Sequence, residues 1–260
     1  MEELLTYQSV EISFGESVVV QDIDLSLHPG EILGIVGESG SGKSTLLKAA
    51  MGLLGSGGAV TKGDIWFRGK NIPDLSERQL RKIRGTEIGM IFQDAGASLC
   101  PIRTIGEQIW ESMSAHRKTS RAEAREKALD LFDKLNFKDG RRIWNSYPFQ
   151  LSGGMNQRAG IAIAMLMEPA VLLADEPTSA LDVIVQRQAV QEMLRLREIF
   201  GTAILLVTHD IGVVSAMADT VLVLKDGRMM EYGKAQQVLR EPQSEYTRKL
   251  LAAVPRLRRN

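Results

Sequence analysis

The chain has 260 residues, in which 32 Lys and Arg balance 32 Asp and Glu, and its only cysteine is Cys100. This length suits one large domain or a core with an inserted subdomain. Balanced charge provides no basic field to attract a nucleic acid. A lone thiol excludes an internal disulfide, which fits a reducing cytosol. The most apolar stretch, residues 161–174, contains Glu168 and Pro169 and is too short to span a membrane.

Short runs of β-branched and apolar residues predict the strands. Residues 10–14 and 18–27 predict antiparallel strands with a turn at Gly15, and residues 65–68 predict a short strand after a glycine-rich loop at 52–63. Buried parallel strands are expected at residues 32–36, 88–92, 171–174, 204–208 and 221–224. Asp226-Gly227 predicts a hairpin turn. The pattern indicates an α/β fold with a mainly parallel sheet and an N-terminal antiparallel β-subdomain.

Residues 95–168 interrupt this alternation with helical periodicity. Helices are expected at 105–113 and 121–135, the second capped by Ser120, and a further helix from Ser152 to Pro169, which cannot continue it. We therefore expect a single domain. Its core comprises residues 1–94 and 169–240, its inserted helical subdomain residues 95–168, and its C-terminal tail residues 241–260.

A glycine-rich loop lies between the strand at 32–36 and a predicted helix at 43–51. It fits the pattern G-x-x-x-x-G-K-[ST] through Gly37, Glu38, Ser39, Gly40, Ser41, Gly42, Lys43 and Ser44. Its glycines let backbone N–H groups converge on phosphate oxygens at a helix N-terminus. Lys43 is expected at the β- and γ-phosphates and the Ser44 hydroxyl on Mg²⁺, with Thr45 beside them. The alternative is an ordinary glycine turn, which the acidic strand end downstream disfavours.

That acidic strand end is Asp175-Glu176, which follows the apolar residues 171–174. Burial of this strand beside the first one would bring both carboxylates to the γ-phosphate. Asp175 is expected to hold Mg²⁺ through water, and Glu176 to orient or deprotonate the attacking water. Phosphoryl transfer requires mainly positioning and charge neutralisation, so no covalent intermediate is needed.

Between these two motifs lies a third string: Leu151, Ser152, Gly153, Gly154, Met155, Asn156, Gln157 and Arg158. Ser152 can cap a helix, and the two glycines expose N–H groups on which a second, facing phosphate could dock. A plain capped helix start does not explain the whole LSGG-x-x-Q string. With the other motifs, this string resembles the signature of ABC ATPases, in which one subunit's LSGG closes over ATP on another's phosphate loop.

The resemblance assigns roles to further residues. Gln93 matches the Q-loop residue that contacts Mg²⁺ or water and joins the helical insert to the core. His209 matches the switch histidine at the γ-phosphate, although a lone histidine is usually structural. Phe14 has about the spacing of the aromatic that stacks on adenine, with Tyr7 as the rival. The signature's Gln157 belongs to the same expected nucleotide site, and a D-loop at the dimer interface is implied by Ser179, Ala180, Leu181 and Asp182.

The resemblance extends to the ATPases of peptide and nickel importers. It rests on Ser98, Leu99, Pro101, Thr104, Ile105, Gly106, Glu107, Gln108, Ile109, Tyr147, Pro148, Gln150, Asp182, Val183, Gln186, and a tail of residues 245–251 with Pro255. Two positions depart from the family: Cys100 replaces its usual Asn and Asn156 a common Arg. The chain lacks the cysteine-rich extension of many members, so no iron–sulfur cluster is expected. This shortness resembles the nickel branch, although short peptide-branch members exist.

The resemblance implies a peripheral ATPase on the cytoplasmic face of the cell membrane, with ATP and Mg²⁺ as cofactors. It would power import of peptides or of nickel and its chelates. Its implied partners are a second ATPase subunit, identical or homologous, two transmembrane permeases, and an extracytoplasmic solute-binding protein, with no nucleic acid. We expect the insert to face the permeases through Ile105 and Ile109. The alternatives are a soluble ABC ATPase acting on nucleic acid or ribosomes, and an exporter ATPase.

Overall fold

A computed structural model of the chain describes residues 3–93, 95–179 and 181–253. The chain forms two compact units, one from Met1–Ser76 with Ala203–Asn260 and the other from Glu77–Thr202. The second unit thus contains the whole predicted helical insert together with flanking strands and helices. The predicted insert boundaries at 95 and 168 stay a prediction.

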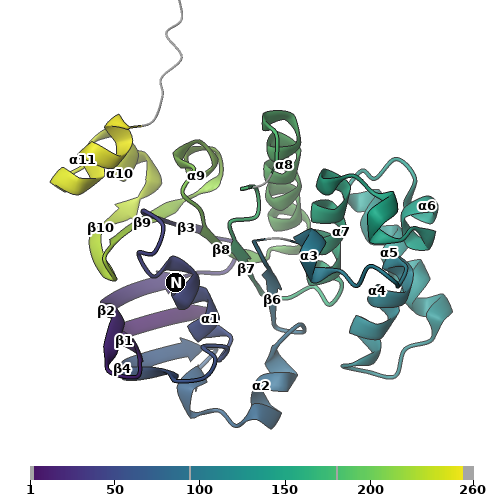
Figure 1. Ribbon diagram of the computed structural model, residues 1–260, viewed down its shortest axis with the longest axis horizontal. Helices are drawn as coiled ribbons and strands as arrows, with labels where there is room; N and C mark the ends of the chain where they lie inside the picture. The colour runs from purple at the N-terminus through teal and green to yellow at the C-terminus, as the bar shows by residue number, and fades with distance from the viewer. Residues whose placement is uncertain (1–2, 94, 180, 254–260) are drawn as a thin grey trace, which may run out of the picture. The chain divides into compact units, whose positions relative to one another are not determined.

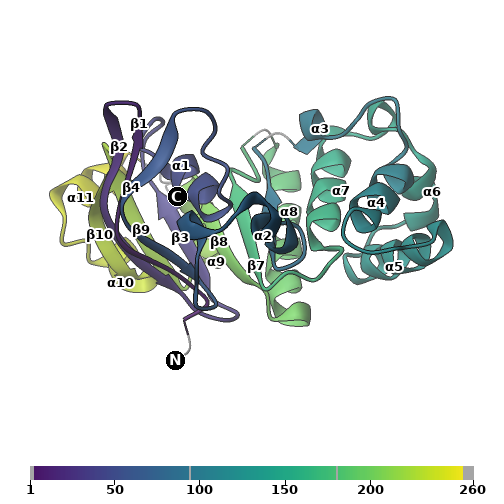
Figure 2. The same cartoon turned by 90° about the horizontal axis from the view of Figure 1, so that it is seen from below.

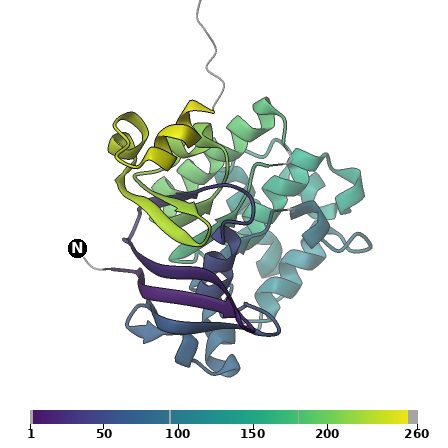
Figure 3. The same ribbon diagram turned by 60° about the vertical axis from the view of Figure 1, so that its left-hand side comes forward.

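An antiparallel sheet occupies the N-terminal part of the first unit (Figure 3). Its strands lie in the order β2-β1-β4-β5 and comprise β1 (Leu5–Phe14), β2 (Ser17–Leu27), β4 (Gly58–Phe67) and β5 (Lys70–Asn71). The expectation of a loop at 52–63 was wrong in part. β4 already begins at Gly58, which pairs with Phe14. Backbone pairing with β1 extends the strand through a polar segment that has no apolar pattern of its own.

Parallel strands, with one antiparallel strand at the end of the row, form the rest of the sheet structure in this unit (Figure 1). β3 (Ile32–Val36) lies between β8 (Ala203–Val207) and β9 (Thr220–Lys225), parallel to both, and β10 (Arg228–Lys234) pairs antiparallel with β9. The predicted hairpin turn between β9 and β10 is confirmed, because Asp226 and Gly227 both have positive φ, 46° and 74°. All residues of β3 and β8 are buried, as their apolar runs predict.

Within the described residues of this unit, four α-helices accompany these strands: α1 (Lys43–Ala50), α9 (Ile211–Met217), α10 (Ala235–Arg240) and α11 (Glu245–Ala252). The predicted tail therefore contains α11, whereas α10 lies in the predicted core, and both helices lie next to β10 in Figure 2. Tyr246 and Leu250 of α11 pack against a buried cluster that includes Val36, the last residue of β3. Pro255, part of the tail's family resemblance, lies outside the described residues.

The second unit contains the parallel strands β6 (Ile88–Ile91) and β7 (Val171–Asp175). Its helices are α2 (Glu77–Ile83), α3 (Ala95–Ser98), α4 (Ile105–Ser114), α5 (Arg121–Lys134), α6 (Gly140–Asn145), α7 (Gly153–Met165) and α8 (Val183–Phe200). Short 3-10 turns occur at Ile72–Asp74 in the first unit and Pro148–Gln150 in the second. Helices α4 to α7 gather into one bundle (Figure 2).

Local capping explains where the bundle helices begin. The Thr104 hydroxyl accepts a 3.2 Å hydrogen bond from Glu107 N, and the Glu107 carboxylate accepts one of 3.0 Å from Thr104 N. Ser120 caps α5 by accepting from Glu123 N, as predicted. Ile105 and Ile109, however, are fully buried. The expectation that they form a docking surface was wrong, because their spacing on α4 turns both into the bundle core.

Within residues 3–93, 95–179 and 181–253, none of the helices has the length and apolar character that a membrane span requires. The strands and their pairing confirm the predicted α/β fold with mainly parallel strands and an N-terminal antiparallel subdomain.

Candidate functional site

The glycine-rich loop at 37–44 is closely packed on one side and open on the other. A Cβ on Gly37 would lie 2.1 Å from the Leu224 carbonyl oxygen, and one on Gly42 would lie 2.8 Å from Val20 Cγ2. Gly40, with φ +82°, would meet nothing within 4 Å. The loop thus has its backbone exposed on one side, where a phosphate could approach the N–H groups ahead of α1.

Lys43 is the first residue of α1 and is buried, yet its ammonium group remains at the loop. Lys43 Nζ donates to the carbonyl oxygens of Gly37, at 2.8 Å, and Glu38, at 2.7 Å. A buried ammonium must have hydrogen-bond acceptors. The loop supplies them, and they hold the positive charge within the loop's own turn.

Ser41 provides a direct test of whether an anion fits this loop. Its Oγ is buried and has no hydrogen-bond partner among the residues that the structure describes. An orphaned buried hydroxyl costs free energy, so a site of this kind calls for a ligand atom or water. Ser44 and Thr45, the next hydroxyl residues, are half-buried in the first turn of α1. The donor set therefore fits phosphate oxygens, and the hydroxyl of Ser44 fits a hard cation.

His209 lies at the same edge of the sheet as this loop. Strands β3 and β8 are parallel, with Ile35 opposite Val207, so both carboxyl ends meet at one edge. The turn after β8 is fixed because Asp210 N donates to Thr208 Oγ1 at 3.0 Å and Asp210 caps α9. The His209 side chain is exposed. The first unit thus groups the phosphate loop with His209.

The two aromatic candidates for stacking on adenine differ in exposure. Tyr7 is buried, and its hydroxyl donates a 2.7 Å hydrogen bond to the Leu46 carbonyl oxygen of α1. Burial raises the pKa of Tyr7 above its ordinary value. Phe14 is 36% exposed at the end of β1. Tyr7 is therefore a core residue, and Phe14 remains the predicted stacking residue.

The second unit holds the predicted acidic and amide groups. Strands β6 and β7 are parallel, with Ile91 opposite Ala174, so Gln93, which follows β6, and Asp175, the last residue of β7, lie at the same edge. Asp175 is buried, whereas Gln93 is exposed. Glu176 has a φ of +45°. A positive φ at a non-glycine residue is a strained conformation of the kind found at functional sites, and it turns the chain sharply after β7.

The signature segment forms the start of helix α7. Ser152 is its N-cap and accepts from Met155 N at 3.3 Å, as predicted. A Cβ on Gly154 would lie 2.4 Å from Val185 Cγ1 of α8, whereas one on Gly153 would meet nothing within 4 Å. Gly154 therefore permits close approach of two helices, and Gly153 leaves the helix end open to an approaching anion.

Two further predicted nucleotide contacts have structural partners inside the chain. Gln157 is buried, and its Nε2 donates to the Pro177 carbonyl oxygen at 2.6 Å. Asp182 caps α8, with Oδ1 accepting from Ile184 N and Val185 N, both at 3.0 Å. The hydrogen bond to Pro177 gives Gln157 a structural role that its position in the motif does not indicate. Ala180, between Ser179 and Asp182, lies outside the described residues.

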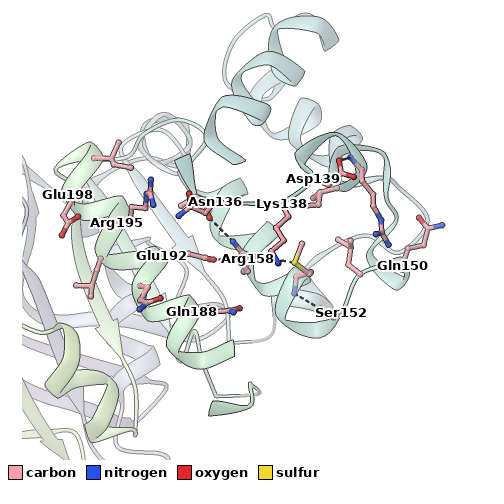
Figure 4. Close-up of a pocket in the computed structure, with 18 residues that line it drawn as sticks. Asn136, Lys138, Asp139, Gln150, Ser152, Arg158, Gln188, Glu192, Arg195 and Glu198 are labelled. Carbon is pink, nitrogen blue, oxygen red and sulfur yellow. Dashed lines mark hydrogen bonds and ion pairs between the residues drawn. The ribbon is translucent and has the colours of Figure 1, made fainter. Parts of the chain in front are cut away.

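Sequence reasoning missed an ion pair behind the signature segment. Arg158 of α7 pairs with Glu192 of α8, and both are largely buried (Figure 4). The pair lines a cleft of about 1130 Å³ that also includes Ser152, Met155 and residues of the α5–α6 loop. A signal was available, because Glu192 interrupts the buried face of α8 formed by Ala189, Val190, Met193 and Leu196.

Comparisons with known proteins show which proteins this chain is similar to. A family model described as "ABC transporter" matches residues 20–179. The chain is 45% identical to the oligopeptide transport ATP-binding protein OppD of Salmonella typhimurium, over 98% of this chain and 77% of the relative. It is 42% identical to the dipeptide transport ATP-binding protein DppD of Lactococcus lactis subsp. cremoris, over 98% and 74%.

Solved structures resemble the fold as well. One is a dimeric ATP-binding cassette in a post-hydrolysis state bound to ADP and Pi, with TM-score 0.77 and 31% identity, covering 89% of this chain and 99% of that one. Another is cbiO1 from Clostridium perfringens, part of the ABC transporter complex cbiONQ. Its TM-score is 0.82 at 27% identity, covering 98% of this chain and 97% of that one.

Proposed function

The chain belongs to the ABC transporter family, and from that premise we propose that it is the ATP-hydrolysing subunit of a transporter that imports peptides. The curated relatives described above are named for oligopeptide and dipeptide transport. Peptides therefore take precedence over nickel as the solute. The balanced net charge provides no basic field that would favour action on nucleic acid.

The observation that carries this proposal is the phosphate loop. Its glycine backbone is open, the Lys43 ammonium is held at the loop by two carbonyls, and the Ser41 hydroxyl is buried without a partner among the described residues. Each of these groups suits a nucleotide's phosphates. A phosphate oxygen of ATP would accept a hydrogen bond from the buried Ser41 hydroxyl. The Lys43 ammonium would bind the phosphates as well as the loop carbonyls.

Hydrolysis would use Glu176 of the second unit and His209 of the first. Glu176 would orient the attacking water and accept its proton, and His209 would contact the γ-phosphate. Ser44, Asp175 and Gln93 would hold Mg²⁺, which when bound neutralises charge on the phosphate oxygens. No covalent intermediate with the protein is required.

A second ATPase subunit, identical or homologous, would complete the site. The open helix end at Ser152 and Gly153 would receive the γ-phosphate of an ATP bound to the facing subunit. Asp182, at the start of α8, would lie near that interface. Two such subunits would close over two ATP molecules, and their closure would drive the membrane part of the transporter.

Two permease subunits and an extracytoplasmic solute-binding protein are the remaining proposed partners, with the chain on the cytoplasmic face of the membrane. Since Ile105 and Ile109 are buried, we assign docking to Ile102 and Phe149, which are 81% and 72% exposed. Their loops are joined by a hydrogen bond from Ile105 N to the Ser146 carbonyl oxygen, 2.9 Å. A contiguous exposed apolar patch marks an interaction surface, and we propose that these two side chains belong to one.

The experiment that tests this proposal compares a strain lacking the gene with its parent. Uptake of a toxic peptide analogue and of radiolabelled nickel is measured side by side, with and without a plasmid copy of the gene. We expect loss of peptide uptake only, restored by the wild-type copy but not by one carrying Lys43→Ala. Loss of nickel uptake with normal peptide uptake would show that the solute is nickel and not a peptide. Unchanged uptake of both would overturn the transport proposal.

A further inference from the structure

The guanidinium of Arg158 contacts four groups from three parts of the second unit. It forms an ion pair with Glu192 of α8, and its Nη2 donates to the Leu135 carbonyl oxygen at 2.9 Å. It lies over the Phe137 ring, 4.2 Å from the centroid, and its Nη1 is 3.8 Å from Met155 Sδ. Because the planar guanidinium has a fixed set of donors, these contacts together define one orientation of the side chain.

The carboxylate of Glu192 is in a costly environment. Its side chain is 8% exposed, and its Oε2 has no hydrogen-bond partner within the described part of the chain. A buried ion pair loses the hydration of both charges, and its mutual attraction commonly does no more than offset that loss. Such a pair is therefore a poor source of stability, and a well-packed apolar pair could replace it without loss. Its best-attested use is to fix one arrangement of packed elements.

A second contact joins α7 to α8 near the Arg158–Glu192 pair. Gly154, one turn before Arg158, lies against Val185 of α8 with no room for a Cβ. Seven residues after Val185, Glu192 receives the Arg158 side chain (Figure 4). Two contacts at different positions along the helix axes fix the rotation of α7 relative to α8. A single contact would let α7 rotate about its own axis. The open helix end at Ser152 and Gly153 belongs to the same rigid helix.

We propose that Arg158 and Glu192 are positioning residues that set the rotation of α7 on α8, so that Ser152 and Gly153 face the nucleotide of a second subunit. This inference rests on the proposed function, because it assigns the signature end to a facing ATP. Neither residue touches the nucleotide. Arg158 acts through helix α7, and Glu192 through its pairing with Arg158.

The test separates positioning from stability by replacing both charges. In a Glu176→Gln parent, which should bind ATP without turnover, we compare Arg158→Met, Glu192→Met and the double variant. Arg117→Gln is the matched control, because it breaks the exposed ion pair with Glu123 in the same unit. Three quantities are measured for each protein: melting temperature, affinity for a fluorescent ATP analogue, and the ATP concentration for half-maximal dimerisation, alone or with the partner ATPase.

We expect Arg158→Met alone to lower the melting temperature, because it leaves the buried Glu192 carboxylate without its cation. The double variant should regain most of that loss, and analogue affinity should stay at the parent's value. Dimerisation of the double variant should nevertheless require at least about tenfold more ATP, a loss of about 1.4 kcal/mol. The Arg117→Gln control should match the parent in all three measurements.

A double variant that melts and dimerises like the parent would overturn the inference, since the pair would then have no role in positioning. Equal loss of stability in the double variant and the single variants would also overturn it, because the pair would then be a simple structural contact. Failure of the parent itself to dimerise with ATP and Mg²⁺, even with its partner ATPase, would count against the proposed function instead. The two failures are therefore distinguishable.

Discussion

The Gln157 side chain donates a 2.6 Å hydrogen bond to the carbonyl oxygen of Pro177. Gln157 belongs to the signature helix α7, and Pro177 follows the strained residue Glu176 at the end of β7. Both partners are buried. The hydrogen bond therefore joins the segment proposed to contact a facing nucleotide to the turn that carries the proposed catalytic carboxylate.

Gln157→Ala should leave the Pro177 carbonyl buried without its donor, which typically costs about 1–3 kcal/mol. We expect a lower melting temperature and a reduced rate of ATP hydrolysis, because the Glu176 turn loses a support. Gln191→Ala, on the exposed face of α8, is the control and should change neither quantity. Calorimetry and a phosphate-release assay make the measurement. If Gln157→Ala has the wild-type melting temperature and rate of ATP hydrolysis, the hydrogen bond contributes to neither stability nor turnover.

Lys43→Ala should abolish ATP binding, since the ammonium at the loop neutralises phosphate charge that solvent cannot reach in a closed site. Fluorescence titration with an ATP analogue provides the measurement. Lys48→Ala changes an exposed lysine of the same helix and should bind normally. Wild-type affinity in Lys43→Ala would contradict the assignment of residues 37–44 as the phosphate loop.

The Glu192 carboxyl should make stability depend on pH. Burial raises its pKa from 4.5 to about 7, although Arg158 acts in the opposite direction. Between these values the folded chain binds more protons than the unfolded chain, so the free energy of unfolding should fall as pH rises through that window. A pKa that differs by one between the folded and unfolded chain corresponds to about 1.4 kcal/mol.

Urea unfolding at a series of pH values measures this dependence. In Glu192→Gln, the fall in the free energy of unfolding between pH 4.5 and 7 should be smaller than in the wild type. Glu198→Gln, an exposed glutamate that lines the same cleft, should leave the dependence unchanged. Identical pH profiles for the wild type and Glu192→Gln would rule out a raised pKa at Glu192.

Ile102→Asp or Phe149→Asp should uncouple ATP hydrolysis from transport, because an added charge would oppose docking of an apolar surface. Both side chains are exposed, so the fold and the basal ATPase rate should be retained. Ile105→Ala offers a contrast: it removes a fully buried side chain and should cost about 2–5 kcal/mol of stability. Normal transport in reconstituted vesicles by both Asp variants would place the permease contact elsewhere.

Local patterns predicted much of the fold and of the candidate site. The buried strands at β3 and β8, the glycine-loop start of α1 and the caps at Ser120 and Ser152 each depend on neighbouring residues alone. Periodicity also shows that α4 is helical. It does not show which side of α4 is covered, so Ile105 and Ile109, expected on a docking surface, are instead buried.

The features that sequence reasoning missed depend on partners distant in the chain. β4 begins at Gly58 because β1 is there to pair with it. Gln157 finds its acceptor twenty residues away at Pro177. Arg158 finds Glu192 on a helix that follows an intervening strand and turn. Such pairings follow from the packed topology and have no local sequence signal.

The most direct measurement of the central claim is peptide uptake by proteoliposomes that contain the whole transporter, with ATP and Mg²⁺ supplied on the side of this subunit. The wild type should take up labelled peptide and release phosphate. Glu176→Gln should bind ATP but do neither, because an amide cannot accept the proton of the attacking water. Undiminished phosphate release and peptide uptake by Glu176→Gln would contradict this account.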